Sequence, residues 1–160
     1  MKDLVAIAEQ IAAHLIERRQ TIAVAESSTG GLISASLLAV PGASAYFLGG
    51  AVVYTRDARR ILMDIPDEAM KGIRSASEPY AKLLASQMRT RFSTDWGLSE
   101  TGATGPTGNR YGDAAGHSCI GIAGLEPSAM TLETGSTDRL ANMHVFASTA
   151  LNFLLQNLER

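Results

Sequence analysis

The segment from residue 21 to residue 31 constrains the fold of this chain more than any other. An apolar run with strand character, residues 21–25, leads into the polar, glycine-bearing turn Glu26–Gly31, and a helical pattern over residues 32–38 follows. A strand that feeds a helix through such a turn puts backbone N–H groups at a helix N-terminus, where an anion or a polar substrate is readily held. The alternative is that the hydroxyls of the turn only cap the helix while its glycines only make the turn.

Helical and strand patterns continue along the rest of the chain. Apolar periodicity, prolines and capping residues predict helices near 4–19, 32–40, 43–48, 56–62, 66–71, 77–88 and 140–158, and strands at 51–54, 96–101, 117–123 and 129–134. The last two strands are expected to form a hairpin, and a glycine-rich loop spans residues 102–116. We therefore predict an α/β fold, a three-layer α/β/α sandwich with a mixed β-sheet, formed by residues 1–160 as a single domain.

Five expectations concern burial. The strand at 51–54 is too apolar for an exposed edge, so we expect it to be buried, whereas the alternating strand at 96–101 is expected to be half-buried. Ile61 and Leu62 are expected to point inward, and Leu140 belongs to the predicted apolar face of the last helix. Cys119 lies in an apolar run, which favours a core residue over a nucleophile.

Composition excludes several classes of function. Fourteen basic and sixteen acidic residues give a net charge of −2, so no basic face for nucleic acid is expected. A single cysteine rules out an internal disulfide framework, and no metal-ligand spacing or cofactor motif is present. Because neither a secretory signal nor an apolar stretch of membrane-spanning length is apparent, we expect a cytoplasmic protein that does not contact membranes.

Several separated segments resemble one family. Residues 25–31 resemble the A-E-S-C-T-G-G signature of the C-terminal domain of the competence/damage-inducible protein CinA, and residues 41–47 resemble its A/P-G-S-S-x-x-F segment. Val53-Tyr54 and the helix after it, through Arg59, are similar to V-x-Y-S-N-x-x-K, residues 101–106 to T-G-I-A-G-P, and Asp138-Arg139 to G-D-R. The family includes nicotinamide mononucleotide (NMN) amidohydrolases, so the resemblance implies its fold and this activity.

The resemblance also implies site residues. In active members a serine attacks the carboxamide of NMN, a lysine acts as the base and a tyrosine assists, releasing ammonia and nicotinic acid mononucleotide. Carried over by position, the catalytic residues are Ser44 as nucleophile, Tyr54, and Arg59 at the lysine position. The implied substrate-binding residues are Glu26, Ser27, Ser28, Thr29, Gly30, Gly31, Thr101, Gly102, Thr104, Gly105 and Arg139.

Arg59 is the departure with chemical consequences. A serine hydroxyl needs a neighbouring base, and a guanidinium stays protonated in proteins, so Arg59 cannot serve as that base. Tyr54 and His117 are two alternatives, although His117 is also consistent with a solvent-exposed strand end. Ser28, Thr104 and Asp113 also differ from the family pattern, in which cysteine, a small residue and lysine occupy these positions.

Two functions of different classes follow. The first is a nicotinamide-nucleotide amidohydrolase, and the second is a non-catalytic protein that binds or senses a pyridine nucleotide or another phosphorylated ligand through the retained positive charge of Arg59. A structural module without a ligand remains a third alternative. The expected partner is a small-molecule mononucleotide, and the family resemblance implies a homo-oligomer.

Overall fold

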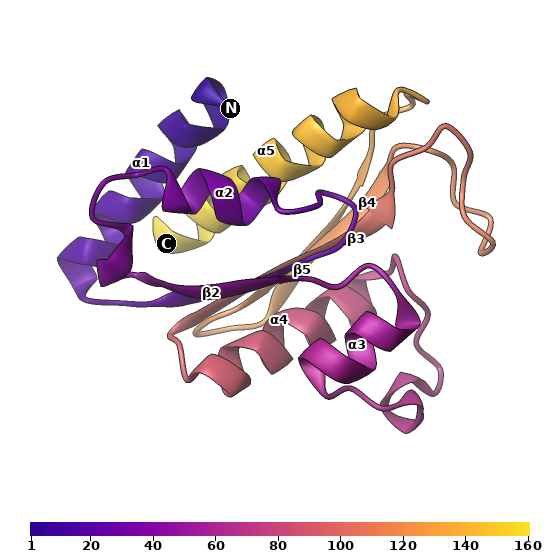
Figure 1. Cartoon of the computed structure of the whole chain (residues 1–160), viewed down its shortest axis with the longest axis horizontal. Helices are drawn as coiled ribbons and strands as arrows, with labels where there is room; N and C mark the ends of the chain where they lie inside the picture. Colours follow the sequence, from indigo (N-terminus) through magenta and orange to yellow (C-terminus); the bar gives the residue numbers. More distant parts are fainter.

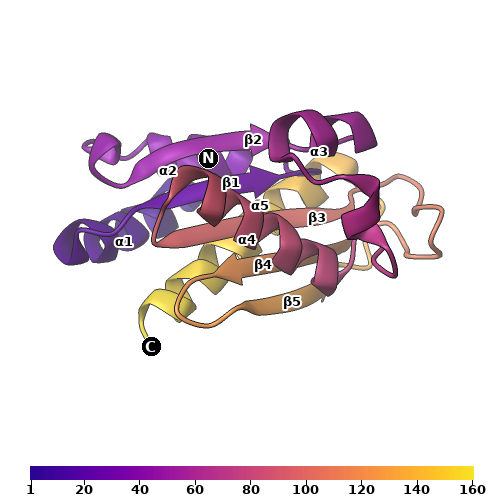
Figure 2. The same cartoon turned by 90° about the horizontal axis from the view of Figure 1, so that it is seen from below.

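A five-stranded mixed sheet forms the middle layer of the fold (Figures 1 and 2). The computed structural model describes all 160 residues. The strand order is β2-β1-β3-β4-β5, with β1 parallel to both β2 and β3, and with β4 antiparallel to both β3 and β5. The strands are β1 (Ile22–Glu26), β2 (Phe47–Val52), β3 (Trp96–Ala103), β4 (His117–Ala123) and β5 (Ser128–Glu133).

Helices cover both faces of the sheet, which confirms the predicted three-layer architecture. In Figure 1, α1 (Lys2–Arg18), α2 (Leu32–Leu38) and α5 (Arg139–Leu158) lie on one side, while α3 (Arg56–Met63) and α4 (Glu78–Phe92) lie on the other. Short 3-10 helices, η1 (Ala43–Ala45) and η2 (Asp67–Met70), complete the connections.

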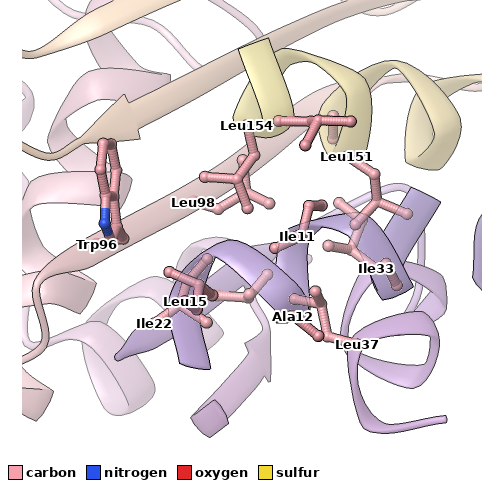
Figure 3. Close-up of a cluster of buried hydrophobic side chains, with 14 of the residues drawn as sticks. Ile11, Ala12, Leu15, Ile22, Ile33, Leu37, Trp96, Leu98, Leu151 and Leu154 are labelled. Carbon is pink, nitrogen blue, oxygen red and sulfur yellow. The ribbon is translucent and has the colours of Figure 1, made fainter. Parts of the chain in front are cut away.

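The larger core lies between the sheet and α1, α2 and α5. Figure 3 shows Ile11 and Leu15 of α1 facing Leu98 of β3, with Leu151 and Leu154 of α5 alongside. Alternate residues of β1 point to this core, whereas Ala23 and Ala25 point to the smaller core under α3 and α4. Because side chains alternate along a strand, this alternation decides which residues reach each side at the end of β1.

Side-chain caps begin three of the helices. Thr55 accepts a hydrogen bond from Ala58 N at the start of α3, Ser77 caps α4, and Asp138 accepts from Ala141 N at the start of α5. A capping side chain satisfies a backbone N–H that has no partner within the helix. The predicted hairpin of β4 and β5 is also present.

The burial of two strands was predicted wrongly. β2 begins at Phe47, includes Gly49, and is an edge strand with alternating burial rather than a buried strand at 51–54. Gly49 belongs in the strand because the Phe92 ring of α4 packs against it, and a Cβ there would lie 2.5 Å from Phe92 Cε1. β3 is buried rather than half-buried, because it is the central strand and helices cover both faces.

Three apolar side chains expected in the core are exposed. Ile61 is 76% exposed and Leu62 44%, whereas Arg59 and Met63 form the buried side of α3. Leu140 at the start of α5 is 75% exposed, because the first turn of that helix extends beyond the core. Cys119 is buried, as expected. None of the helices is long and apolar enough to span a membrane.

Candidate functional site

The carboxyl ends of the parallel strands open onto a cavity of about 620 Å³. This is the edge of an open α/β sheet at which ligands ordinarily bind, and the volume lies in the range of small-molecule sites. Segments after β1, β2 and β3 form its walls together with α3 and the connection that leads into α4. The lining residues are Ser27, Val53, Tyr54, Thr55, Arg56, Arg59, Asp67, Met70, Ile73, Arg74, Ser75, Ala76, Tyr80, Thr101, Gly102, Asn109, Arg110 and Tyr111.

Positive charge is concentrated in this cavity, which we call the arginine cavity. Arg56, Arg59, Arg74 and Arg110 line it, and Asp67 is the only acidic lining residue. The chain as a whole carries a net charge of −2. A cleft lined by charge of one sign raises the local concentration of oppositely charged ligands, so this cavity favours an anion.

Arg59 is held in place by the wall of the cavity. The side chain is 6% exposed, its Nε donates to the Ile65 carbonyl at 3.2 Å, and its Nη2 pairs with Asp67. Arg56 and Arg60 bind the same carboxylate, and hydrogen bonds from these two guanidinium groups hold the pKa of Asp67 well below its usual range. One carboxylate therefore serves three guanidinium groups, which leaves positive charge for a ligand.

Tyr54 lies at the mouth of the arginine cavity rather than against Arg59. Its hydroxyl is 3.2 Å from Arg139 Nη2, and the side chain is 60% exposed. Arg139 also donates through Nη1 to the Gly105 carbonyl at 2.6 Å, which ties the start of α5 to the loop after β3. Arg139 itself does not line the cavity.

The 102–116 loop supplies a second arginine-bearing wall. Arg74 forms a bidentate pair with Asp113 at 2.6 and 3.0 Å, and this pairing lowers the pKa of Asp113. Arg74 and Arg110 each lie 5.3 Å from the centroid of the Tyr111 ring. Asn109 Oδ1 accepts hydrogen bonds from the backbone N–H groups of Tyr111 and Asp113, so a polar side chain of the loop itself orders the loop. Asp113, at the family's lysine position, thereby orders an arginine of the cavity.

Residues Ser27–Gly31, which we call the polar loop, do not hold an external anion at the start of α2. Glu26 occupies that place, because its carboxylate accepts from the backbone N–H groups of Gly31, Ile33 and Ser34 and from the hydroxyls of Thr29 and Ser34. The prediction of a ligand-binding helix N-terminus is therefore wrong in this chain. The donors expected for a ligand are already satisfied by a buried side chain.

A second buried carboxylate lies under the polar loop. Glu100, on β3 directly beside Glu26, accepts from Ser27 N, from Thr29 N and Oγ1, and from the hydroxyls of Ser28 and Ser118. No cation neutralises it, and burial raises the pKa of its carboxyl even though these hydrogen bonds act in the opposite direction. The hydroxyls of Ser28 and Thr29 are consequently used inside the protein.

Ser27 is the exception in the polar loop. Its side chain lines the arginine cavity, and its hydroxyl makes no hydrogen bond within the chain. Gly30 and Gly31 adopt positive φ angles of 63° and 107°, and this turn redirects the chain into α2. The geometry leaves Ser27 as the hydroxyl of this loop that is free to meet a ligand.

The structure does not bring Ser44 to the arginine cavity. Ser44 lies in η1, before the first residue of β2, whereas Tyr54 follows the last residue of the same strand. Six strand residues, which rise roughly 3.3 Å each, therefore separate the two segments. Ser44 and Tyr54 lie at opposite ends of β2, so the structure does not bring together the serine and the tyrosine that the resemblance pairs.

His117, another predicted residue, takes a structural role. His117 is buried rather than solvent-exposed, and its ring contacts Glu133 and the Ala76 carbonyl, the latter at 2.7 Å. Although burial lowers the pKa of His117, these two hydrogen bonds outweigh it and raise the pKa above its ordinary value. His117 does not reach Ser44, and it does not line the arginine cavity.

Some of the predicted residues of β3 and the loop after it line the cavity, and the others are used inside the protein. Thr101 and Gly102 line the arginine cavity, and Thr101 Oγ1 accepts from Ala76 N at 3.2 Å. Thr104 is buried and its carbonyl accepts from Asn142, while Gly105 is bound to Arg139. Of the predicted site residues, those that line the cavity are Ser27, Tyr54, Arg59, Thr101 and Gly102.

Several cavity residues were missed from the sequence. Arg56, Arg74, Arg110 and Tyr111 each stand in a segment where arginine or tyrosine has an ordinary solvent-exposed interpretation. Glu100 does not line the cavity, but it was a usable signal for the hydrogen-bonded polar loop beside the cavity. It is a charged residue within a strand between buried neighbours, and carboxylates are rarely buried without dedicated donors. Across the chain, no cluster of three or more histidine, cysteine or acidic side chains forms a metal site.

Comparisons with known proteins agree with this fold. The family model described as the CinA C-terminal domain matches residues 4–158. A CinA-like protein of Synechococcus sp. (strain CC9902) is 41% identical over 110 residues, which are 69% of this chain and 26% of that protein. One from Chlorobaculum tepidum is 36% identical over 160 residues, 97% of this chain and 38% of that protein. The chain thus spans well under half of these relatives' length.

Solved structures show the same architecture. A CinA superfamily protein from Klebsiella pneumoniae superposes with a TM-score of 0.91 at 22% identity, covering 98% of both chains. A competence/damage-inducible protein from Agrobacterium tumefaciens superposes with a TM-score of 0.89 at 25% identity, covering 99% of this chain and 96% of that one.

Proposed function

The chain belongs to the CinA C-terminal domain family, and from this premise we propose that it is a nicotinamide-nucleotide amidohydrolase-like protein with Ser27, not Ser44, as the nucleophile. The ligand is an anionic mononucleotide bound in the arginine cavity. The observation that carries the proposal is the unbonded Ser27 hydroxyl in a cavity that also holds Tyr54 and four arginines. The reaction converts the carboxamide of NMN and water into a carboxylic acid and ammonia.

The arginine cavity accounts for recognition of the phosphate. A guanidinium presents paired N–H donors that match phosphate oxygens, and Arg56 and Arg110 are exposed arginines of the cavity lining. Met70, Ile73 and Tyr80 offer apolar and aromatic surface in the same cavity, against which the flat pyridinium ring of NMN can pack. These features support a proposal in which phosphate recognition and the candidate nucleophile share one site.

Arg59 limits the expected rate. General-base assistance typically contributes about 10²–10⁴-fold, and the Arg59 guanidinium, paired with Asp67, cannot accept a proton. We therefore expect hydrolysis that is slow relative to a lysine-containing site. The same observation supports the second candidate function, a binding or sensing protein for a phosphorylated nucleotide, in which the arginine cavity binds without turnover.

Ammonia release from NMN tests the first function. We expect measurable release by the purified protein, background release by Ser27→Ala, and unchanged release by the matched variant Ser44→Ala. Loss of activity in Ser44→Ala with retention in Ser27→Ala would overturn the assignment of the nucleophile.

Calorimetric titration with NMN separates the two functions. Binding together with ammonia release supports the amidohydrolase. Binding without release above that of Ser27→Ala supports the sensor, and the absence of binding at millimolar NMN contradicts both.

A further inference from the structure

The carboxylate of Glu100 is hydrogen-bonded to the backbone of Ser27. Its Oε2 accepts from Ser27 N at 3.1 Å, while the Ser27 hydroxyl has no partner. A fully buried carboxylate without a cation is costly, so its retention beside the candidate nucleophile calls for an explanation. The proposed function so far assigns it no role beyond holding the polar loop.

The same molecule shows what one carboxylate oxygen does with a serine or threonine. Glu100 Oε2 accepts from both N and Oγ1 of Thr29, at 3.0 and 3.1 Å. Glu26 Oε2 accepts from both N and Oγ of Ser34, at 2.9 and 2.7 Å. Asp95 Oδ2 likewise accepts from N and Oγ1 of Thr21, at 2.8 and 3.2 Å. In all three, the hydroxyl joins the oxygen that already binds the backbone N–H.

Ser27 has half of this arrangement. Its N–H is bound to the same Glu100 Oε2 that binds the N–H of Thr29, while its hydroxyl makes no hydrogen bond and can turn about the Cα–Cβ bond. Such rotations are fast and connect staggered wells of similar energy. From this geometry we propose that Glu100 is the general base that activates Ser27, in the role that Arg59 cannot fill. This inference rests on Ser27 being the nucleophile of the proposed function.

Proton movement balances in each half of the reaction. Glu100 Oε2 takes the Ser27 hydroxyl proton as Oγ bonds to the carboxamide carbon, and returns it to the amine as the C–N bond breaks and ammonia leaves. Water then attacks the resulting ester, its proton passes to Glu100, and the ester C–O bond breaks as Ser27 recovers its proton. No other reactant is needed.

The surroundings of Glu100 suit this role. Burial raises the pKa of its carboxyl, and a raised pKa makes a carboxylate a stronger base nearer neutral pH. Glu26 is the one other ionisable group that shares a donor with it, through the Thr29 hydroxyl. The adjoining α2 carries no ionisable side chain, and on α5, Arg139 is bound to Gly105 and His144 to Asp3.

Ser28 and Ser118 tune the carboxylate. Their hydroxyls donate to Glu100 Oε1, at 2.5 and 3.0 Å. The other oxygen, Oε2, accepts from Ser27 and Thr29. Ser28 stands at the family's cysteine position, so the departure there supplies Glu100 with a hydroxyl donor in place of a weakly donating thiol. Hydrogen bonds to the charged form lower a carboxyl pKa, so removing either donor raises it further.

Labelling of Ser27 by a fluorophosphonate tests the inference without an amide substrate. Labelling of the full chain is followed by mass spectrometry across a pH range. We expect the rate at Ser27 to rise with pH as Glu100 ionises, and Glu100→Gln to lower it about 10²–10⁴-fold and to abolish that pH dependence. The glutamine fits the site, because its amide oxygen can face the Ser27 and Thr29 N–H groups and its NH₂ the two serine hydroxyls.

Ser118→Ala provides the matched control, because it keeps the carboxylate. We expect its labelling profile to shift to higher pH while the plateau is retained, an effect that a purely structural role of Glu100 would not produce. If Glu100→Gln does not fold, the shift in Ser118→Ala decides the question. Labelling of Ser27 in Glu100→Gln at the wild-type rate, an unshifted Ser118→Ala profile, or no labelling of wild-type Ser27 would overturn the inference.

These outcomes are distinct from failure of the proposed function. Base-assisted labelling of Ser27 without ammonia release from NMN would leave Glu100 as the base and exclude NMN as the substrate. Ammonia release that survives in Glu100→Gln would retain the amidohydrolase and remove Glu100 as its base.

Discussion

The polar loop and the arginine cavity lie at the same edge of the sheet and use charge in opposite ways. In the polar loop, two buried carboxylates, Glu26 and Glu100, take up nearly all the donors that the sequence offers. In the arginine cavity, one lining carboxylate, Asp67, faces four arginines. The difference teaches that a motif rich in donors is a poor guide to a ligand site when the protein supplies its own anion.

The largest expected effect is a loss of stability when the carboxylate that binds the polar loop and the start of α2 is removed. Glu26→Ala leaves the buried N–H of Ile33 and the part-buried N–H groups of Gly31 and Ser34 without a partner. Because each unsatisfied buried group costs about 1–3 kcal/mol, we expect the free energy of unfolding to fall by at least about 3 kcal/mol. Urea denaturation measures it.

Arg56→Ala is the corresponding change in the arginine cavity, and we expect it to leave the urea midpoint unchanged. An equal loss of stability in both variants would erase the contrast between the two regions.

The next effect concerns chemistry in the arginine cavity. Arg59→Lys places a group that can lose its proton in the cavity that Ser27 lines, so ammonia release from NMN should rise, by up to about 10²-fold where the missing lysine rather than Glu100 sets the rate. Arg60→Lys, on the same helix and bound to the same Asp67 but outside the cavity lining, should leave the rate unchanged. A rate that responds to neither substitution would indicate that the missing lysine is not what limits hydrolysis.

Ligand affinity provides a smaller effect. Arg110 pairs with no carboxylate and lines the arginine cavity, so Arg110→Ala should weaken binding of NMN about tenfold, and high salt should reduce the difference. Arg19→Ala, an exposed arginine at the end of α1, serves as the control in calorimetric titration. Equal affinity of the two variants would remove Arg110 from the site.

The smallest effect arises behind the cavity wall, where His117 supports the Ala76 carbonyl. Since the pKa of His117 is raised in the folded protein, its contribution to stability is fully present below the unfolded value of about 6.5 and is lost as pH rises through the folded pKa. Unfolding midpoints should therefore decline modestly above about pH 6.5, and Glu133→Gln should flatten this decline. A midpoint that rises over the same range in the wild type would contradict the assignment.

The fold was predictable because its signals are local. Apolar periodicity and the caps at Thr55, Ser77 and Asp138 depend on neighbours along the chain, and these elements are where they were expected. Errors arose where neighbours in space decide. Phe92 packing on Gly49 extends an edge strand, and helices on both faces bury β3 completely.

The site was predictable only in part for the same reason. Tyr54 and Arg59, which the resemblance paired, both line the arginine cavity, but the choice between Ser27 and Ser44 depends on which edge of the sheet each segment reaches. The arginines from α3, the α4 approach and the 102–116 loop come together only in the folded chain. Sequence spacing contains no information about that convergence.

A crystal structure of the protein soaked with nicotinic acid mononucleotide tests the central claim most directly. We predict ligand density in the arginine cavity, with the phosphate in contact with Arg56 or Arg110 and the pyridine carboxyl group near the Ser27 hydroxyl. Density beside Ser44, or a phosphate bound to the backbone N–H groups of the polar loop in place of Glu26, would contradict it.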